Sequence, residues 1–562
     1  MKGIGVSPGR VIGPVARMGD PVAEPRADQP LSTTAELATE QLKAASARVA
    51  EDLKARASRA SGDGKAVLEA TALMASDPML IKSAAKLIAG GASPERAMWD
   101  AAAKVAAQLE SLGGYMAERV HDVYDVRSRI IAELRGESAP GVPESSVPFV
   151  LVAHDLAPAD TATLDPAKVL ALVTAEGGPQ SHTAILARAL GLPAVVAVHE
   201  AGALVDGAEV FVDGGSGEVV SPPTPENVAA ATQWAVQAAE LGSFDGRGQL
   251  ADGYPVPLLA NIGTVADARA AVEANAEGVG LFRTEFLFLD RADEPSVHEQ
   301  VAAYRGVFDL FAGKKVVVRT LDAGADKPLP FLSDAEEPNP ALGARGFRTE
   351  LRTPGVLGRQ LSAIAEAASG SDAEVWVMAP MVSTGPEAAA FKAMCEVAGL
   401  PVAGAMVEVP SAAINADHIL TFADFASIGT NDLTQYTMAA DRQVGVLAEF
   451  NDPWQPAVIA MVEATTLGAA RAAKAAGANS AKPIGVCGEA AADPGYAVVL
   501  VGLGVQTLSM TARALPAVAR VLATVTLDGA RSIAAKARAA ATAGEARAAV
   551  REELPVLEEL GL

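Results

Sequence analysis

The sequence predicts a multidomain α/β protein: an N-terminal α/β domain with an inserted helical bundle, followed by a (β/α)8 barrel of the TIM type. Three observations predict this fold class. Strand and helix patterns alternate over residues 149–220, and the strand-like residues 1–20 can complete that domain. Residues 33–135 have an almost entirely helical pattern. Residues 250–562 contain eight short apolar runs separated by helical patterns, which is the arrangement of a barrel.

The predicted α/β domain draws its strands from two separate parts of the chain. We expect them at Gly3–Pro8, Arg10–Arg17, Phe149–Ala153, Val169–Thr174, Ala194–Val198, Val210–Val212 and Val219–Val220. A helix pattern begins after Gly177-Gly178 and stops at Gly191-Leu192-Pro193. A further helix, residues 226–241, leads away from this domain.

The helical segment between these parts begins with a capping signal. Ser32 or Thr33 can cap the first helix, and Glu36 lies three residues past Thr33, as a capping box requires. Its apolar face is expected to contain Leu37, Leu42, Val49 and Leu53. Breaks divide the segment into four or five helices, and they lie at residues 61–64, 77–78, 90–91 and 113–114.

The barrel strands are predicted from the eight apolar runs. They are Val256–Asn261, Gly278–Phe282, Lys315–Asp322, Val375–Met381, Gly404–Val409, Phe425–Thr430, Pro483–Gly488 and Val505–Met510. The predicted domains are therefore residues 1–20 plus 140–222 (α/β domain), 30–138 (inserted helical domain), 223–247 (linker helix) and 248–562 (barrel). The Pro-rich stretches at 139–148 and 221–225 are candidate hinges between them.

Composition excludes several classes of protein. The formal net charge of −23 disfavours nucleic acid and anionic membranes as general partners. We find neither an apolar run of the ~18 residues that a membrane span needs nor a signal-peptide core, so we expect no membrane insertion and a cytosolic location. The two cysteines, Cys395 and Cys487, form no Cys-x-x-Cys pair, which argues against a disulfide scaffold or a structural zinc site.

His182 is the strongest candidate for a phosphoryl carrier. It falls in the first turn of the helix that follows Gly177-Gly178. Backbone N–H groups and the positive end of the helix dipole favour an anion there. An imidazole with a pKa of ~6.5 is largely neutral at pH 7, so one ring nitrogen is free to attack phosphorus.

A second group of polar residues follows the predicted barrel strands, at the end where barrel enzymes carry their chemistry. The group contains Arg283, Arg319, Lys327, Arg345, Glu408, Asn431, Asp432, Arg442 and Cys487. Arginines supply rigid donors for phosphate and carboxylate. The carboxylates of Glu408 and Asp432 suit Mg²⁺, although Mn²⁺ has the same preference for oxygen ligands. A thiol with a pKa of ~8.5 is mostly protonated at pH 7, so Cys487 can give a proton to an enolate carbon.

These strings resemble a known family. Residues 177–188 match the signature G-G-x-x-S-H-T/A-x-I-x-A-R of the swivelling phosphohistidine domain of phosphoenolpyruvate-utilising enzymes. Together with residues 278–291, 427–442 and 486–489, they make the chain similar over nearly its whole length to the enzyme I family of the bacterial phosphoenolpyruvate–sugar phosphotransferase system. That family transfers the phosphoryl group of phosphoenolpyruvate to a histidine of the phosphocarrier protein HPr and releases pyruvate.

The resemblance implies a role for most of the candidate residues. His182 would be the phosphorylated histidine, and Thr161 would hydrogen-bond its ring. Arg283, Arg319 and Arg442 would grip phosphoenolpyruvate and Asn431 would contact it, with Lys327 and Arg345 as further substrate-binding residues. Glu408 and Asp432 would bind Mg²⁺, and Cys487 would be the proton donor. The inserted helical domain would dock HPr, and the barrel would form a homodimer.

Three other functions fit parts of the sequence. A dikinase or phosphoenolpyruvate synthase shares the histidine domain and barrel, but it needs a large ATP-binding module, and we find no P-loop. A non-catalytic regulator is disfavoured because it need not keep the full set of arginines, carboxylates and histidine. A paralogue feeding a nitrogen-linked relay is disfavoured because no additional N-terminal sensory domain is expected.

Overall fold

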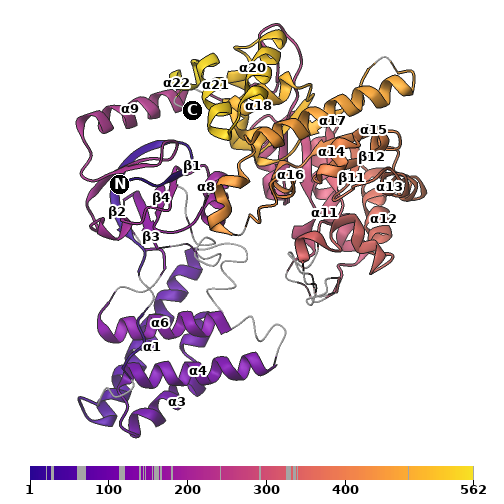
Figure 1. The fold of residues 1–562 in the computed structure, drawn as a ribbon. Coiled ribbons are helices and arrows are strands. Elements are labelled where there is room, and N and C mark those ends of the chain that lie inside the picture. Colours follow the sequence, from indigo (N-terminus) through magenta and orange to yellow (C-terminus); the bar gives the residue numbers. More distant parts are fainter. Residues whose placement is uncertain are drawn as a thin grey trace. The chain divides into compact units, whose positions relative to one another are not determined.

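The computed structural model describes most of the 562 residues. Outside the described set lie residues 20–21, 27–30, 60–70, 113–119, 138–140, 144, 146, 155, 157–163, 165–167, 179–180, 241, 290, 292, 324–328, 330, 333–336, 338, 443, 479 and 561. The chain divides into two compact units, residues 1–232 and 233–562, each with its own layers (Figure 1). Among the described residues, no helix is both long enough and apolar enough to cross a membrane.

A seven-stranded sheet forms the centre of the first unit, in the order β1-β5-β4-β3-β2-β6-β7. Its strands are β1 Ile4–Ser7, β2 Arg10–Arg17, β3 Phe149–Ala153, β4 Val169–Thr174, β5 Ala194–Val196, β6 Glu209–Asp213 and β7 Glu218–Val220. β2 pairs in parallel with β3 and antiparallel with β6, so it lies inside the sheet, whereas β1 forms one edge and pairs with β5. Two strands from the N-terminal residues, β1 and β2, thus belong to the same sheet as the strands from residues 149–220.

The two faces of the sheet have separate apolar layers, because alternate residues of each strand point to opposite faces. On one face, Leu151 and Leu172 pack with Ala184 and Ala187 of α8 (His182–Leu190). The other face is covered by the segment around the short 3-10 helix η1 (Ala201–Ala203). The α8 helix is thereby held against the sheet by its alanines.

The helical insertion has its own buried core. Its described helices are α1 Ala35–Arg59, α3 Pro78–Ala89, α4 Pro94–Leu112 and α6 Val120–Arg135. The expected cap at Ser32 or Thr33 is wrong, because Thr34 Oγ1 accepts the N–H of Leu37 and α1 starts one residue later. Leu37 is consequently exposed rather than part of the apolar face, whereas Leu42, Val49 and Leu53 are buried. The breaks expected at 61–64 and 113–114 lie outside the described residues.

Asp77 and Gly90 mark the ends of α3, where sequence had placed breaks. Asp77 accepts the N–H of Met79, and Pro78 occupies the first helical position, where a missing N–H costs nothing. The linker helix α9 spans Pro225–Glu240, close to the expected 226–241.

The second unit is a closed barrel of eight parallel strands in chain order. The strands are β8 Leu258–Ile262, β9 Gly278–Arg283, β10 Lys315–Arg319, β11 Glu374–Ala379, β12 Ala403–Val407, β13 Phe425–Ile428, β14 Ile484–Val486 and β15 Thr507–Met510. All eight expected strands are present, and the predicted fold class is confirmed. Several strands end two or three residues earlier than expected, since the last register pairs are Arg319 with Met378, Val407 with Ile428, and Ile428 with Val486.

Helices surround the strands, and a large apolar core lies between the two layers. The helices are α10 Val265–Glu273, α11 Val297–Phe308, α12 Val356–Ser369, α13 Gly385–Ala398, α14 Pro410–Ile414, α15 Ala416–Leu420, α16 Thr430–Met438, α17 Pro456–Ala475, α18 Pro494–Gly502, α19 Leu515–Leu522, α20 Leu527–Ala539, α21 Ala543–Glu553 and α22 Val556–Glu559. Short 3-10 turns are η2 Glu285–Leu287, η3 Asp309–Phe311, η4 Pro340–Leu342, η5 Gly346–Leu351, η6 Gly445–Asn451, η7 Glu489–Ala492 and η8 Ala512–Ala514. A smaller apolar cluster fills the barrel interior and includes Leu281, Met406 and Cys487.

Candidate active site

The candidate site of the barrel lies at the C-terminal ends of its strands, where the predicted residues gather. Arg283 ends β9 and Arg319 ends β10, and the two residues are register partners on these neighbouring strands. Glu408 directly follows β12, and Asp432 lies in the first turn of α16, just after β13. The parallel order of the strands puts all of these ends at the same mouth.

Three buried carboxylates form the centre of this site. Asp322, Glu408 and Asp432 each offer an oxygen, and these atoms lie within 4.8 Å of one another. All three side chains are buried, and Asp432 Oδ1 accepts no hydrogen bond of good geometry among the described residues. Oxygen ligands of this charge are those that a hard divalent cation takes. The cluster therefore fits a divalent cation.

Two buried arginines lie against the carboxylates. Arg345 is fully buried: its Nε and Nη2 lie 3.3 Å from the two oxygens of Asp322, and its Nη1 lies 3.1 Å from Asp432 Oδ1. Arg319 Nη1 lies 3.2 Å from Asp322 Oδ2 and 3.8 Å from Glu408 Oε1. Paired guanidinium groups of this kind keep their charge in a site from which water is largely excluded.

Glu285 fixes the remaining side of Arg319. Its Oε1 accepts Arg319 Nη2 at 2.7 Å and the backbone N–H of Asp322 at 3.0 Å. Burial opposes the charge on Arg319, but Glu285, Asp322 and Glu408 outweigh it and raise the pKa of the guanidinium above its ordinary value. Arg319 is thus a permanent cation at the mouth of the barrel.

The pKa of the Glu408 carboxyl is higher than that of an ordinary surface acid. Burial, and then the neighbouring charges of Asp322 and Asp432, raise the pKa of Glu408 to about 7, although the two arginines oppose this. Its Oε2 accepts the backbone N–H of Met381 at 3.0 Å, which fixes the orientation of the carboxyl. A bound cation would favour the ionised form of this group.

Cys487 lies at the bottom of the same mouth, directly after β14. Burial raises the pKa of its thiol to about 11; Ser427 lowers it and Glu408 raises it again. The thiol donates toward the carbonyl oxygen of Ile428, with 3.7 Å between Sγ and O. Because it stays protonated at neutral pH, this thiol has the protonation state that a proton donor needs.

The remaining described residues of the predicted set lie around this centre. Arg442 Nη1 is 3.8 Å from Asp432 Oδ2, at the more exposed side of the cluster. Asn431 Oδ1 lies 3.4 Å from the backbone N of Glu489, two residues beyond Cys487. The thiol of Cys487 is close enough to Arg283 for the arginine charge to lower its pKa. Arginines, carboxylates, amide and thiol thus lie at one mouth.

Comparison with known proteins places this site in a family. A family model described as the PEP-binding domain of PEP-utilising enzymes matches residues 241–527. Models of the N-terminal and mobile domains of PEP-utilising enzymes match residues 2–119 and 146–217. The phosphoenolpyruvate-protein phosphotransferase of Streptomyces coelicolor is 53% identical over 557 residues, which cover 99% of each chain. The chain belongs to the phosphoenolpyruvate-protein phosphotransferase family, the enzymes I.

Other relatives carry the same name. The phosphoenolpyruvate-protein phosphotransferase of Haloferax volcanii is 41% identical over 497 residues, covering 85% of each chain. That of Bacillus subtilis is 35% identical over 534 residues, covering 91% of this chain and 92% of the relative. The predicted family and the predicted enzyme class, phosphoryl transfer from phosphoenolpyruvate to a protein, are confirmed.

Some predicted residues of this enzyme I chain cannot be placed. Thr161 and Lys327 lie outside the described residues, and so does the side chain of His182. The backbone of His182 is described, and it opens α8 as expected from the sequence. The roles of these three residues stay predictions.

Two residues of the site were not singled out from the enzyme I sequence. Asp322 stands three residues after Arg319, and Glu285 stands two residues after Arg283. The same rule that selected the arginines, a polar residue just beyond a barrel strand, also applies to both carboxylates. Nothing in the linear sequence indicates that Glu285 pairs with Arg319 of the next strand, since that contact depends on the register between β9 and β10.

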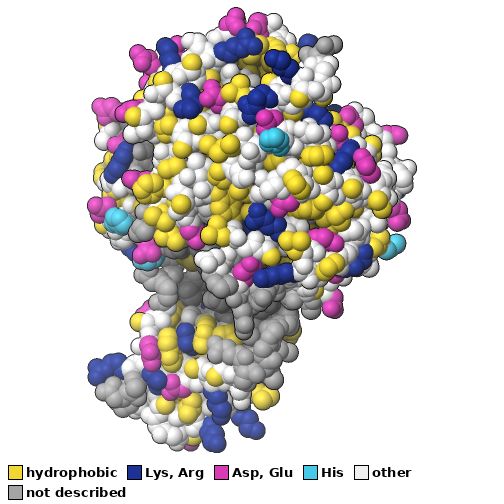
Figure 2. Space-filling view, turned by 45° about the vertical axis from the view of Figure 1, so that its right-hand side comes forward, with side chains coloured by type: hydrophobic (Ala, Val, Ile, Leu, Met, Phe, Trp, Pro, Cys, Tyr) yellow, Lys and Arg dark blue, Asp and Glu magenta, His cyan; other side chains and the backbone are white. Residues whose placement is uncertain are grey.

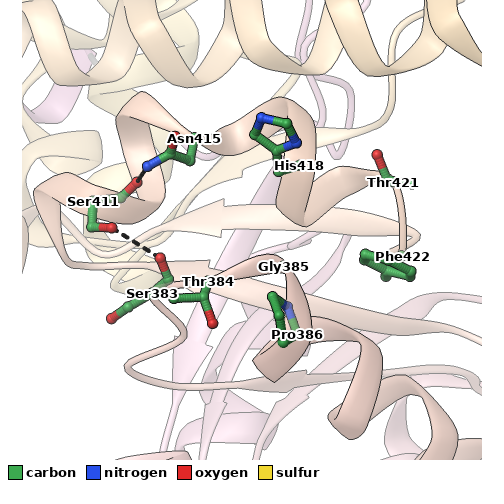
Figure 3. A pocket seen from close by; sticks show the side chains of 9 residues that line it. All are labelled: Ser383, Thr384, Gly385, Pro386, Ser411, Asn415, His418, Thr421 and Phe422. Carbon is green, nitrogen blue, oxygen red and sulfur yellow. Dashed lines mark hydrogen bonds between the residues drawn. The ribbon is translucent and has the colours of Figure 1, made fainter.

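A separate hollow on the enzyme I barrel lacks the cationic side chains that a substrate with a phosphate and a carboxylate group requires. It has a volume of about 420 Å³ and is lined by the start of α13 and by α14 and α15. Figure 3 shows hydroxyl groups, Asn415, His418 and Phe422 around it, with Ser411 donating to the carbonyl oxygen of Ser383. Its lining contains no arginine, lysine or carboxylate. Charge therefore favours the carboxylate and arginine cluster as the site of chemistry.

Proposed function

We propose that this enzyme transfers the phosphoryl group of phosphoenolpyruvate to His182 and then to a histidine of the phosphocarrier protein HPr, releasing pyruvate. This is the first step of sugar uptake by the phosphotransferase system. The observation that carries the proposal is the buried cluster at the barrel mouth, in which Arg319 and Arg345 face three carboxylates. The family membership supplies the overall reaction.

Phosphoenolpyruvate carries a phosphate and a carboxylate, and the barrel mouth offers guanidinium groups for both. We assign Arg283, Arg319, Arg345 and Arg442 to substrate binding, with Asn431 and Lys327 as further contacts. Buried guanidinium groups act strongly because little water competes with them. They are held in place before substrate arrives, so little reorganisation is needed in the transition state.

We assign the cation site to Glu408 and Asp432, with Asp322 beside them, and Mg²⁺ to this site. The fit rests on the closeness of the three buried carboxylates and on Asp432 Oδ1, which accepts no hydrogen bond of good geometry among the described residues. When bound, Mg²⁺ supplies positive charge that stabilises the phosphoryl oxygens during transfer.

The transfer itself is a substitution at phosphorus. A ring nitrogen of His182 attacks phosphorus, the bond from phosphorus to the enol oxygen breaks, and the electron pair stays on that oxygen as an enolate. The thiol of Cys487 then gives its proton to the methylene carbon, which yields pyruvate and a thiolate. Water returns a proton to sulfur, because burial keeps the pKa of this thiol near 11.

His182 serves as the carrier because of its place in the fold. It opens α8, so backbone N–H groups at the helix start can hold the phosphoryl oxygens. Thr161 is assigned to orient the imidazole, and the helical insertion is assigned to dock HPr. The phosphorylated domain then moves between the barrel and HPr, with the Pro-rich stretches at 139–148 and 221–225 as hinges.

We further propose that the enzyme is a cytosolic homodimer that associates through its barrel. The side of the barrel formed by α13, α14, α15 and α17 exposes Val397, Ile414, Phe422 and Leu467. Figure 2 turns the barrel so that its right-hand side comes forward and shows apolar side chains gathered there. Apolar patches of this kind on a folded domain commonly mark protein interfaces.

The proposed function is tested by incubating the protein with labelled phosphoenolpyruvate, Mg²⁺ and purified HPr while pyruvate is counted. We expect an acid-labile, base-stable label on the enzyme that moves to HPr. His182→Ala should carry no label, whereas the control His199→Ala, in the same domain, should be labelled like the wild type. Label on His182→Ala contradicts the assignment, and formation of ATP from phosphoenolpyruvate would favour a dikinase instead.

A further inference from the structure

A buried glutamine behind the active site connects two of the strand ends that form it. Gln360 lies on α12 and is 1% exposed. Within the described part of the chain, its side chain makes no hydrogen bond to the three carboxylates of the site. It bonds instead to the segments that carry the site residues of β9 and β10.

The contacts of Gln360 use both ends of its amide. Oε1 accepts the backbone N–H of Leu321 at 2.9 Å, and Nε2 donates to Thr284 Oγ1 at 3.0 Å and to the Tyr304 hydroxyl at 3.2 Å. Thr284 in turn donates its hydroxyl to the carbonyl oxygen of Arg319 at 2.9 Å. Gln360 thus bonds to both segments, 283–285 and 319–322, and reinforces the direct contacts that Thr284 and Glu285 make between them.

These two segments also carry residues that we assign to substrate and cation binding. Thr284 stands between Arg283 and Glu285, and Leu321 directly precedes Asp322. Beyond the end of β10 the Leu321 N–H has left the strand ladder, so the amide of Gln360 supplies its acceptor. Without that acceptor a buried donor stays unpaired, and the segment must shift to regain a partner.

We propose that Gln360 is a positioning residue for the phosphoryl-transfer site, which acts by fixing Arg319 and Asp322 relative to Arg283 and Glu285. This rests on the proposed function, because it assigns those groups to substrate and cation. Groups that orient binding residues from behind commonly change ligand affinity on the order of 10- to 100-fold when they are altered. Affinity and rate depend on such placement to within fractions of an ångström.

The chain offers a matched control for this residue. Gln300 on α11 is also fully buried, donates to the carbonyl oxygen of Pro295, and accepts the Tyr304 hydroxyl. It thus shares the residue type, the burial and the tyrosine with Gln360. Among the described residues, its hydrogen bonds reach only Pro295 and Tyr304 and no strand end of the site, so we expect its loss to lower stability alone.

The experiment compares Gln360→Met with Gln300→Met in the full chain. Mn²⁺ affinity is measured by electron paramagnetic resonance without substrate, and KM and kcat for phosphoenolpyruvate are measured with HPr. For Gln360→Met we expect Mn²⁺ affinity to fall and KM to rise, each on the order of 10-fold or more. Gln300→Met should keep wild-type values of both. Gln360→Glu retains an acceptor for Leu321 and should recover part of the loss.

Two further points make the outcome decisive. If Gln360→Met does not fold, Thr284→Val keeps the shape of the side chain but removes the bond from Gln360 Nε2 and the bond to the Arg319 carbonyl oxygen, so it should raise KM in the same direction. Equal effects of Gln360→Met and Gln300→Met, or unchanged Mn²⁺ affinity and KM in Gln360→Met, overturn the inference. A wild type that binds Mn²⁺ but phosphorylates no HPr contradicts the proposed function, whereas the contrast in Mn²⁺ affinity still tests Gln360.

Discussion

At the scale of single residues, the site is a cluster of opposed charges taken out of water. Two guanidinium groups face four carboxylates, those of Glu285, Asp322, Glu408 and Asp432. Burying ions costs several kcal/mol each unless partners replace the lost water, and such clusters seldom add net stability. In the proposed function, the excess of negative charge would instead favour a bound cation, and the fixed arginines would favour an anionic substrate.

Asp322 should matter for both ligands, because it touches both arginines and belongs to the carboxylate triad. Asp322→Asn keeps the size of the side chain and removes the charge. We expect Mn²⁺ affinity to fall about 10-fold or more and KM for phosphoenolpyruvate to rise. Titration calorimetry checks the first, and Asp417→Asn, which removes a surface partner of Arg471, is the control. Wild-type Mn²⁺ affinity in Asp322→Asn would exclude a role at the cation site.

Cation binding should depend on pH through Glu408. Its pKa of about 7 in the absence of metal means that a proton must leave as the cation binds. Mn²⁺ affinity should therefore rise as pH increases toward 7, up to about tenfold per pH unit, and level off above it. Calorimetry at matched ionic strength measures this. A constant affinity across that range would show that Glu408 is already ionised.

The raised pKa of Glu408 should make the metal-free protein less stable as pH rises, whereas metal affinity should increase. The folded protein holds the Glu408 proton at pH values where the unfolded chain has lost it, because the folded pKa is raised from 4.5 to about 7. The contribution of this group to stability is therefore lost as pH rises through that window. Added Mn²⁺ should restore thermal stability most strongly at the upper end.

At the scale of elements, the site depends on how closely neighbouring strand ends approach. Gly488 follows Cys487 at the end of β14, and Thr430 follows β13. A Cβ atom on Gly488 would lie 1.8 Å from Thr430 Oγ1 and 2.6 Å from its backbone nitrogen. The main chain at this point has no room for a side chain, so the two strand ends carry Cys487 and Asn431 at a fixed separation.

Gly488→Ala should consequently damage the site through the backbone. We expect a lower melting temperature and a kcat reduced on the order of 10-fold or more, since reacting groups misplaced by about 1 Å lose much of their rate. Gly358→Ala on α12 is the matched control, because a Cβ there meets nothing within 4 Å. That change should raise stability by about 0.5–1 kcal/mol. Wild-type kcat in Gly488→Ala would show that this spacing is not needed.

At the scale of the whole molecule, the division into two units separates the proposed tasks. Residues 233–562 contain the groups that we assign to substrate and cation binding, and residues 1–232 contain the helix that begins at His182. Each unit has its own apolar core, so each can keep its internal geometry while the other moves. This arrangement suits a carrier that receives the phosphoryl group in one place and gives it up in another.

Association of two barrels is the prediction that belongs to this scale. Val397 is 91% exposed and Ile414 is 56% exposed on the proposed interface. The double variant Val397→Asp, Ile414→Asp should shift the protein from dimer to monomer in sedimentation velocity, because like charges would meet across a symmetric contact. Val205→Asp, on the 68% exposed Val205 of the first unit, should remain dimeric. An unchanged dimer in the double variant would place the interface elsewhere.

The sequence alone determined the outline of this protein. Eight apolar runs predicted eight barrel strands. The positions of Arg319, Glu408 and Asp432 at the ends of these runs predicted that they lie together at the barrel mouth. Both predictions were possible because hydrophobic periodicity and strand ends are local properties of the chain. The helix start at His182 was equally local, since it follows from glycines and an apolar repeat. Local signals failed only in detail, as at the first cap, where Thr34 replaced Thr33.

Only the tertiary structure decided the partners inside the site. The pairing of Glu285 with Arg319, the place of Asp322 in the triad, and the bridge through Gln360 all join residues from different strands or helices. The raised pKa of Glu408 also depends on the tertiary structure, because it arises from burial and from neighbours distant in the chain. Such effects depend on strand register and packing, and these are set by the closure of the whole barrel rather than by any short stretch of sequence.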